Sequence, residues 1–206
     1  MPEIRTRMIV GILLAAGAGR RFGGDKLLAK VADGLCVAEL SAARLAPTVD
    51  RLIAVVRPGN DALAERLAQA GAEVMPCPTA HEGMGASLAF GVRQAPDADG
   101  WLIALADMPL VATDDIRRVA DALRAGAAIA LPVAGDRRGH PVGFSRHFFD
   151  ELTALGGDAG ARALLQRHAA AITPVPVADA GTWLDLDTAD DLAALRQQAS
   201  AQSPKK

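Results

Sequence analysis

Aromatic residues are scarce in this chain of 206 residues: they make up 3% of it, and tyrosine is absent. A protein that stacks the bases of single-stranded nucleic acid on its side chains needs more of them. The formal net charge of −2 gives no support for a surface that binds nucleic acid or an anionic membrane. Any phosphate group must therefore be bound at a local site.

Cysteine and long apolar runs are also rare. Cys36 and Cys77 form no C-x-x-C pair, and with four scattered histidines they offer no obvious zinc ligand set. The N-terminus does not resemble a signal peptide, and the apolar stretch Met8–Ala16 is too short to span a bilayer. We therefore expect a cytoplasmic protein with reduced thiols and no membrane partner.

What the chain does have is an alternation of apolar runs with helix-like stretches, which is typical of an α/β protein with a mainly parallel sheet. We expect strands at Met8–Ala16, Arg51–Val56, Glu73–Met75, Trp101–Ala106, Ala127–Val133 and Ile172–Val177. We expect helices at Val37–Leu45, Asn60–Ala70, Gly83–Gln94, Thr113–Arg124, within Leu152–His168, and from Thr188 to about Gln198. Thr113, Asp114 and Asp115 are the expected cap of the fourth helix. Residues 135–144 indicate a hairpin, in which Pro141 disfavours a central strand.

A glycine-rich loop directly follows the first expected strand. Its glycines bring backbone N–H groups close to phosphate oxygens, and its cations neutralise a polyphosphate. The spacing excludes a dinucleotide fingerprint, because Phe22 occupies its last glycine position, and a Walker A loop, because Asp25 precedes the lysine. The loop contains Gly17, Gly19, Gly23 and Gly24, with Arg20, Arg21 and Lys26 between and after them.

Acidic residues lie where further strands end. Asp107 follows the strand Trp101–Ala106, and Pro109 fixes the turn that presents its carboxylate. Asp185 and Asp187 alternate with leucines, so on an extended segment both face one side. Mg²⁺ prefers one or two carboxylates together with phosphate oxygens. We expect Asp107, with Asp187 or Asp185, to bind the metal, and we expect Lys26 and Asp107 to lie on the same side of the molecule.

The loop L-x-A-G-x-G-x-R-x-G-G-x-K, at residues 14–26, resembles the signature of the MobA-like nucleotidyltransferases, which have the Rossmann-like three-layer α/β/α fold of the nucleotide-diphospho-sugar transferases. The resemblance implies that Arg21 and Lys26 hold the triphosphate and stabilise the departing pyrophosphate, and that these two residues and Asp107 are catalytic. The resemblance also implies a nucleotide site formed by Leu14, Ala15, Ala16, Gly17, Gly19, Arg20, Gly24 and Ser87.

Segments across nearly the whole chain resemble the molybdenum cofactor cytidylyltransferase branch: residues 83–92, 104–109, 138–144, 155–162 and 185–188. The branch transfers CMP from CTP to molybdenum-bound molybdopterin. The resemblance implies Mg²⁺ as the cofactor, CTP and a molybdopterin-type acceptor as partners, with a molybdoenzyme or its chaperone as a further candidate. Ala16, where the guanylyl branch has glycine, disfavours a purine base by its added methyl group. The acceptor side is expected to contain His140, Pro141, Asp158 and Arg162.

These expectations describe a single domain over residues 1–199, with an NTP-binding half at about 8–110, an acceptor-binding half at about 111–199 and a flexible tail at 200–206. Asp158 and Arg162 are expected to share a helix face at spacing i, i+4, so they could form a structural ion pair instead of binding the acceptor.

Two other functions are open for the whole chain. It could be an enzyme of the same fold that uses GTP or a sugar or polyol phosphate, or a non-catalytic carrier of the cofactor. His81, His147 and His168 are expected to be surface residues.

Overall fold

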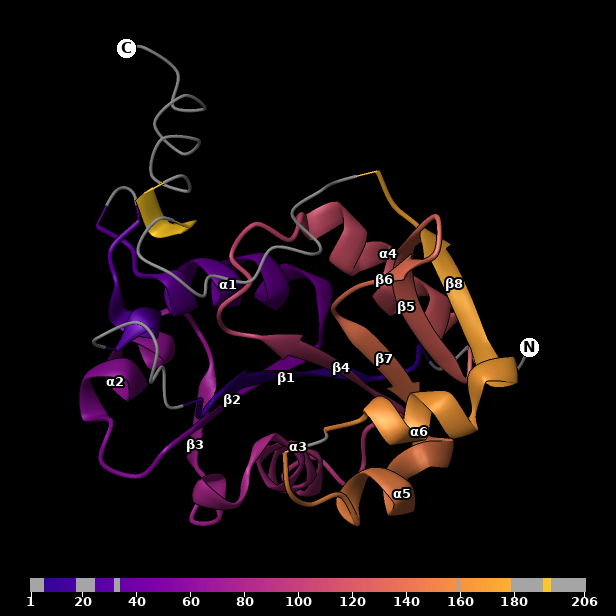
Figure 1. Cartoon of the computed structure of the whole chain (residues 1–206), viewed down its shortest axis with the longest axis horizontal. Helices are drawn as coiled ribbons and strands as arrows, with labels where there is room; N and C mark the ends of the chain where they lie inside the picture. The colour runs from indigo at the N-terminus through magenta and orange to yellow at the C-terminus, as the bar shows by residue number, and fades with distance from the viewer. Residues whose placement is uncertain (1–5, 18–24, 32–33, 159, 179–190, 194–206) are drawn as a thin grey trace.

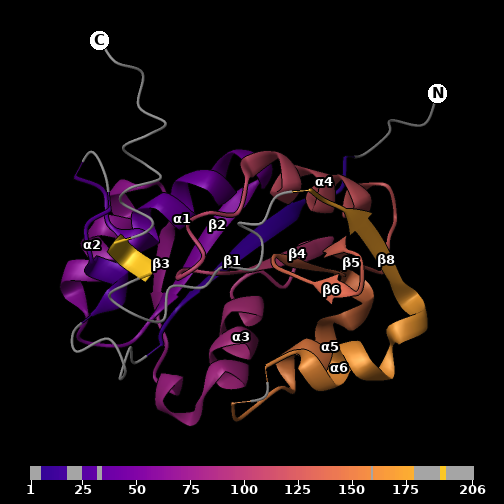
Figure 2. The same cartoon turned by 45° about the horizontal axis from the view of Figure 1, so that its top comes forward.

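The computed structural model describes residues 6–17, 25–31, 34–158, 160–178 and 191–193. It consists of one sheet of eight strands with helices on both faces (Figure 1). Figure 2 shows α1, α2 and α4 over one face, and α3, α5 and α6 over the other. The three-layer α/β/α fold expected from the sequence is thus confirmed.

The strands follow the expected apolar runs closely. In chain order they are β1 Ile9–Ala15, β2 Arg51–Val56, β3 Glu73–Pro76, β4 Gly100–Leu105, β5 Ile129–Ala134, β6 Arg137–Arg138, β7 Val142–Ser145 and β8 Ile172–Pro176. The order across the sheet is β3-β2-β1-β4-β7-β5-β6, and β8 pairs with β5. The pairs among β3, β2, β1 and β4 are parallel, so their carboxyl ends meet at one edge.

The helices are α1 Val37–Leu45, α2 Asp61–Gln69, α3 Met84–Arg93, α4 Thr113–Arg124, α5 Phe149–Thr153 and α6 Arg162–Arg167. Short 3-10 turns occur at Lys26–Leu28, Ala46–Thr48, Ala80–Glu82, Arg146–Phe148 and Ala169–Ala171. In α4 the buried residues Ile116, Val119, Ala120 and Leu123 recur at helical spacing and form one apolar stripe. None of the helices in the described part of the chain is long and apolar enough to cross a membrane.

Two buried clusters, one on each face of the sheet, form the core. One joins strand residues to α1, α2 and α4, including Leu45, Leu67 and Leu123. The other joins the sheet to the helices of the opposite face, including Val92 and Leu164. Both cysteines are buried and free. The strand β1 is covered on both sides and is continuously apolar, and β2 is apolar after Arg51, as is usual for the inner strands of parallel sheets.

Two local expectations are wrong. The strand β7 lies in the interior of the sheet, antiparallel to both β4 and β5, although Pro141 was expected to disfavour a central strand there. Pro141 precedes the first residue of β7, so its missing N–H removes no bond from the strand ladder. The N-cap of α4 is Ala112, and Thr113 to Asp115 form the first helical turn, where the helix dipole favours the two carboxylates.

Candidate active site

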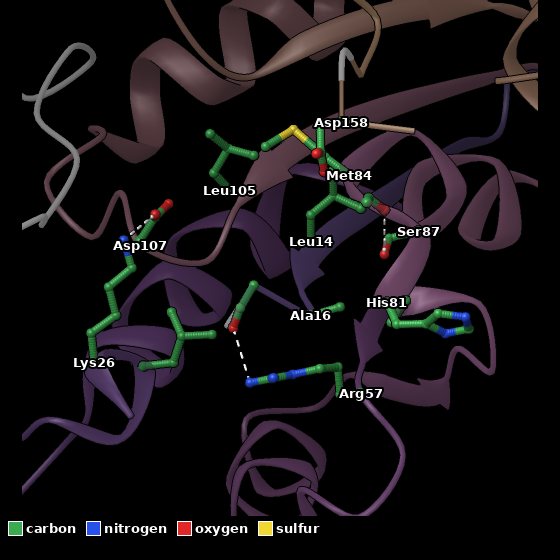
Figure 3. Close-up of a pocket in the computed structure, with 14 residues that line it drawn as sticks. Leu14, Ala16, Lys26, Arg57, His81, Met84, Ser87, Leu105, Asp107 and Asp158 are labelled. Atoms are coloured by element: carbon green, nitrogen blue, oxygen red, sulfur yellow. Dashed lines mark hydrogen bonds and ion pairs between the residues drawn. The ribbon is translucent and has the colours of Figure 1, made fainter. Parts of the chain in front are cut away.

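Three neighbouring parallel strands end beside one cavity. Figure 3 shows Ala16 after β1, Arg57 after β2 and Asp107 just beyond β4 around this space. The cavity has a volume of about 610 Å³. It is lined by Leu14, Ala16, Gly17, Lys26, Leu27, Arg57, Ala80, His81, Gly83, Met84, Ser87, Leu105, Asp107 and Asp158. The edge formed by the carboxyl ends of parallel strands is where α/β proteins bind ligands.

Lys26 and Asp107 meet at this edge. The Nζ atom of Lys26 lies 2.8 Å from Oδ2 of Asp107, and both side chains are largely but not completely buried, with exposed fractions of 15% and 24%. The expectation that these residues lie on the same side of the molecule is confirmed. A cation and a carboxylate that remain partly accessible, beside a cavity, can bind a phosphate and a metal ion respectively.

The turn that carries Lys26 is held by Asp25. One carboxylate oxygen, Oδ1, accepts a hydrogen bond from the backbone N–H of Leu27 at 3.1 Å. The other, Oδ2, accepts one at 2.8 Å from the side-chain amide of Asn60, which precedes α2. Asp25 is thus the N-cap of the 3-10 turn Lys26–Leu28 and links it to a second element. The aspartate that breaks the Walker A pattern here has a structural use.

Helix α1 supports the turn that carries Asp107. The buried hydroxyl of Ser41 donates to the carbonyl oxygen of Ala106 at 2.9 Å. The guanidinium of Arg44 donates to the carbonyl oxygens of Leu110 and Val111 at 3.3 and 3.2 Å. These bonds attach both ends of the turn to one helix, so the carboxylate of Asp107 projects from a fixed backbone.

The N-terminus of α1 is itself held by a buried carboxylate. Oε2 of Glu39 accepts a hydrogen bond from the backbone N–H of Cys36 at 2.7 Å, and its Oε1 lies 3.4 Å from Nη1 of Arg66 on α2. Burial raises the pKa of Glu39, but the bonds from Cys36 and the charge of Arg66 outweigh burial and lower the pKa below 4.5. Burial, the largest influence, raises the pKa of the Cys36 thiol.

Most of the predicted nucleotide residues that the structure describes line the cavity, namely Leu14, Ala16, Gly17 and Ser87. Ala15 does not line it and is buried within β1. The hydroxyl of Ser87 donates to the carbonyl of Gly83 at 3.3 Å, one turn earlier in the chain. Gly19, Arg20, Arg21, Gly24, Asp185 and Asp187 lie outside the described residues. Their assignments stay predictions.

Two polar residues around the cavity, Arg57 and His81, were missed by sequence reasoning. Arg57 follows β2 directly, and its guanidinium donates to the carbonyl oxygen of Gly17 at 3.3 Å. His81 was expected to be an ordinary surface residue; it is exposed, but it also lines the cavity. The position of Arg57 could have been inferred from the sequence, because it directly follows β2, whose carboxyl end lies at the same edge of the sheet as that of β1. Nothing in the sequence indicated the position of His81.

A second cavity, of about 270 Å³, adjoins the first. Leu14, Met84 and Leu105 line both. Its other walls are largely apolar, and its polar side chains are those of Arg138, His140 and Arg162. Two of the predicted acceptor-side residues, His140 and Arg162, thus lie together at this cavity. Pro141 does not line this cavity, but together with His140 it lines a small crevice.

Asp158 is positioned differently from the expectation. Arg162 is the first residue of α6, and Asp158 precedes the helix, so the two do not share a helix face. Asp158 instead lines the first cavity, against the start of α3. The segment before Asp158 packs closely on the start of α3. A Cβ atom on Gly85 would lie 2.6 Å from the carbonyl oxygen of Gly156, and the N–H of Gly85 donates to the carbonyl oxygen of Gly157 at 2.7 Å.

Within the described part of the chain, no group of three or more histidine, cysteine or acidic side chains is arranged to hold a metal ion. Asp107 is the predicted metal ligand that the structure describes, and it offers one carboxylate at the cavity. A Mg²⁺ ion that is bound mainly through the phosphates of a nucleotide needs only one or two protein carboxylates. The donor set at Asp107 fits such an ion.

Comparison with known proteins gives consistent results. The profile of the MobA-like NTP transferase domain matches residues 11–172. The purine catabolism protein PucB of Bacillus subtilis is 30% identical over 96% of this chain and 100% of its own length. The bifunctional protein GlmU of Nitrobacter hamburgensis is 35% identical over 76% of this chain, which spans only 36% of that longer protein.

The crystal structure of Rv0371c from Mycobacterium tuberculosis superimposes with a TM-score of 0.80 at 33% identity, over 93% of this chain and 98% of that one. A complex of Rv0371c with manganese superimposes with a TM-score of 0.75 at 29% identity, over 92% of this chain and 98% of that one. Both likenesses extend over nearly the whole of each chain.

Proposed function

Because the chain belongs to the MobA-like NTP transferase family and is a nucleotidyltransferase, we propose that it transfers CMP from CTP to the phosphate of molybdenum-bound molybdopterin and releases pyrophosphate. The observation that carries this proposal is the ion pair of Lys26 and Asp107 at the strand ends, beside a cavity of about 610 Å³. This arrangement provides a cation for the triphosphate and a carboxylate for a metal ion at one place.

The reaction needs no protein nucleophile. An oxygen of the acceptor phosphate, already anionic near neutral pH, attacks the α-phosphorus of CTP. A new P–O bond forms there while the bond to the bridging oxygen of the β-phosphate breaks, and pyrophosphate leaves with that oxygen. The ammonium group of Lys26 stabilises the charge on the pyrophosphate, and the loop arginine Arg21 is assigned the same role by resemblance.

Enzymes of this family typically depend on a divalent metal, and the related Rv0371c has been crystallised with manganese. We propose Mg²⁺ for this chain, held by Asp107 together with Asp187 or Asp185 and the phosphates. When bound, the ion would neutralise phosphate charge and polarise the P–O bonds. Ser41 and Arg44 keep the carboxylate of Asp107 in place for it.

The choice of CTP rests on Ala16, whose methyl group lies at the cavity beyond β1 and leaves less room than a glycine would. One methyl group discriminates by only about 1–3 kcal/mol. The choice of acceptor rests on the segments that resemble the cytidylyltransferase branch and on the second cavity. His140 and Arg162 at that cavity are suited to the polar and anionic groups of such an acceptor, and the largely apolar walls are suited to the faces of its rings.

The experiment is pyrophosphate release by the purified chain with CTP, GTP, ATP or UTP in turn, each with and without molybdenum-bound molybdopterin and with Mg²⁺. We expect release that requires molybdopterin and is fastest with CTP, and a cytosine dinucleotide product by mass spectrometry. Preference for GTP, or release with glucose 1-phosphate in place of molybdopterin, would replace the proposal by another transferase of the same fold. Binding of the cofactor without any release would indicate a carrier.

A further inference from the structure

Two cavities of different chemistry share one boundary. The first is lined by charged and hydroxyl groups, including Lys26, Asp107 and Ser87, and the second is mostly apolar. Leu14, Met84 and Leu105 line both and therefore form the boundary between them. In the view of Figure 3 the sulfur of Met84 lies above Leu14, between Leu105 and Asp158. A group transfer between molecules in the two cavities has to take place across these three side chains.

Two of the three boundary residues are fixed by the sheet. Leu14 and Leu105 are paired in register on β1 and β4, at the carboxyl ends of the strands. The carbonyl of Leu14 also accepts a hydrogen bond from the backbone of Ala106 at 3.1 Å. The backbone positions of Leu14 and Leu105 cannot change without breaking the strand ladder. The side chain of Met84 is the most exposed of the three and has the most rotatable bonds.

The backbone of Met84 is fixed as well, but its side chain is not. Met84 begins α3, between Gly83, which has a φ of +122°, and Gly85, which packs on residues 156 and 157. Its side chain, in contrast, is 46% exposed, which is exceptional for a large apolar residue in the described part of this protein. A Cβ atom on Gly160 would lie 3.2 Å from the Met84 sulfur, so the glycine leaves room for the thioether.

Methionine is suited to this position by its chemistry. It has three freely rotating side-chain bonds and a polarisable sulfur, which contacts flat conjugated rings favourably. An exposed apolar side chain costs free energy unless a ligand covers it. At the boundary of the apolar cavity, such a ligand would be the ring system of the acceptor, while its phosphate reaches the nucleotide in the first cavity.

We propose that Met84 determines acceptor specificity, by covering the ring system of the acceptor and limiting which acceptors reach the nucleotide. The proposal rests on the proposed function for the identity of the two substrates. It assigns no role in the chemical step to Met84. It predicts that the length and polarisability of the side chain at position 84 affect the affinity for the acceptor and leave the affinity for CTP unchanged.

The test compares Met84→Ala and Met84→Leu with Leu35→Ala. Leu35 is also a large exposed apolar residue, at 39%, but it lines neither cavity, which makes it the matched control. The probe is pterin-6-carboxylate, whose binding is followed by its own fluorescence anisotropy, and CTP binding is measured by calorimetry. We expect the Kd for the pterin to rise about tenfold in Met84→Ala and about threefold in Met84→Leu.

Leu35→Ala should leave both constants within twofold of the wild type, and all variants should bind CTP within that limit. If the wild type binds no pterin, or if Met84→Ala binds it as the wild type does, the inference is overturned even when CTP turnover is normal. If pterin binding depends on Met84 but neither the wild type nor any variant releases pyrophosphate from CTP, the role of Met84 in binding the ring system stands and the proposed function fails. A parallel loss of CTP binding in Met84→Ala would also overturn the inference, since it would indicate general distortion.

Discussion

Ser41 and Ala106 are connected by a hydrogen bond of 2.9 Å that joins the middle of helix α1 to the turn beyond strand β4. The donor is a hydroxyl group that is almost completely buried, on the face of α1 that packs on the sheet. The acceptor is the carbonyl oxygen of the residue directly before Asp107. A side chain remote from the cavity thus helps to fix the direction of the carboxylate inside it.

We expect Ser41→Ala to reduce the free energy of unfolding by about 1–3 kcal/mol, because it leaves a buried carbonyl without this donor. It should also reduce kcat with little change in the KM for CTP, because the position of Asp107 becomes less well defined. Urea unfolding and steady-state kinetics measure both. Ser87→Ala is the stability control, since the carbonyl of Gly83 also accepts from the backbone N–H of Ser87. Equal destabilisation by the two variants would contradict the argument.

Asp107→Ala should abolish transfer while the chain remains folded. The ion pair with Lys26 is largely buried, so its loss leaves an ammonium group without this partner and should reduce the free energy of unfolding by about 1–3 kcal/mol, which leaves the fold intact. The loss of kcat should be at least about a hundredfold, as for the removal of a group that stabilises the transition state. Circular dichroism and pyrophosphate release test the two parts. Turnover like that of the wild type would refute the assignment of Asp107 as a metal ligand.

Asp25→Ala should lower kcat/KM about tenfold, because the turn that carries Lys26 loses its cap. Loss of an N-cap side chain also costs about 1 kcal/mol of stability. Asn60→Ala should have a smaller effect, about twofold to threefold in kcat/KM, because Asp25 still accepts from Leu27. Kinetics of both variants with CTP decide the matter. Normal kcat/KM in Asp25→Ala would show that Lys26 is positioned by other contacts.

Gly85→Ala should destabilise the protein by about 1–3 kcal/mol, although alanine is the better helix former. The new Cβ atom would lie 2.6 Å from the carbonyl oxygen of Gly156, which is backbone. Gly59→Ala is the comparison, because its Cβ would meet no atom within 4 Å and only the positive φ of +81° opposes it. Thermal and urea unfolding measure both variants. An increase in stability in Gly85→Ala would mean that residues 156–158 move away without cost.

The carboxyl group of Glu39 should make stability depend on pH. Its pKa is lowered on folding, since the bonds from Cys36 and the charge of Arg66 outweigh the effect of burial. Such a group stabilises the fold above its unfolded pKa, near 4.5, and the contribution is lost as the pH falls through the lower folded value. Urea unfolding at pH 7 and pH 3.5 should show a smaller difference in Glu39→Gln than in the wild type.

The control for this pH dependence is Glu65→Gln, which removes an exposed carboxylate from α2. It should leave the difference between the two pH values close to that of the wild type. If Glu39→Gln shows the full wild-type difference, the buried carboxylate of Glu39 does not contribute to the pH dependence.

Much of the fold could be predicted because most of its strands and helices follow from the pattern of residues that are neighbours in the sequence. The bounds of β2, Arg51–Val56, are those expected from a run of apolar residues, and the bounds of α1, Val37–Leu45, are those expected from a stretch rich in alanine and leucine. That Lys26 and Asp107 lie on the same side of the molecule was predictable as well, because both residues follow parallel strands whose carboxyl ends meet at one edge. These features could be placed from the sequence because they depend on local residue patterns and on the regular geometry of parallel sheets.

The errors arose where distant contacts decide the structure. Pro141 disfavoured a central strand by its local chemistry, but pairing with β4 and β5 placed β7 inside the sheet. Asp158 lines the first cavity because the backbone of residues 156–157 packs on the start of α3. The spacing of residues within 155–162 gives no indication of that contact with α3.

The sequence by itself thus determined the order of strands and helices, the fold class, the cationic loop and the carboxylate opposite it, since each depends on residues that are close in the chain or on the general geometry of parallel sheets. The tertiary structure alone decided that His81 joins the first cavity and that Met84, with Leu14 and Leu105, lies between it and the second. Those features depend on which side chains from separate elements come within a few ångströms of one another, and the packing of the whole chain sets these distances.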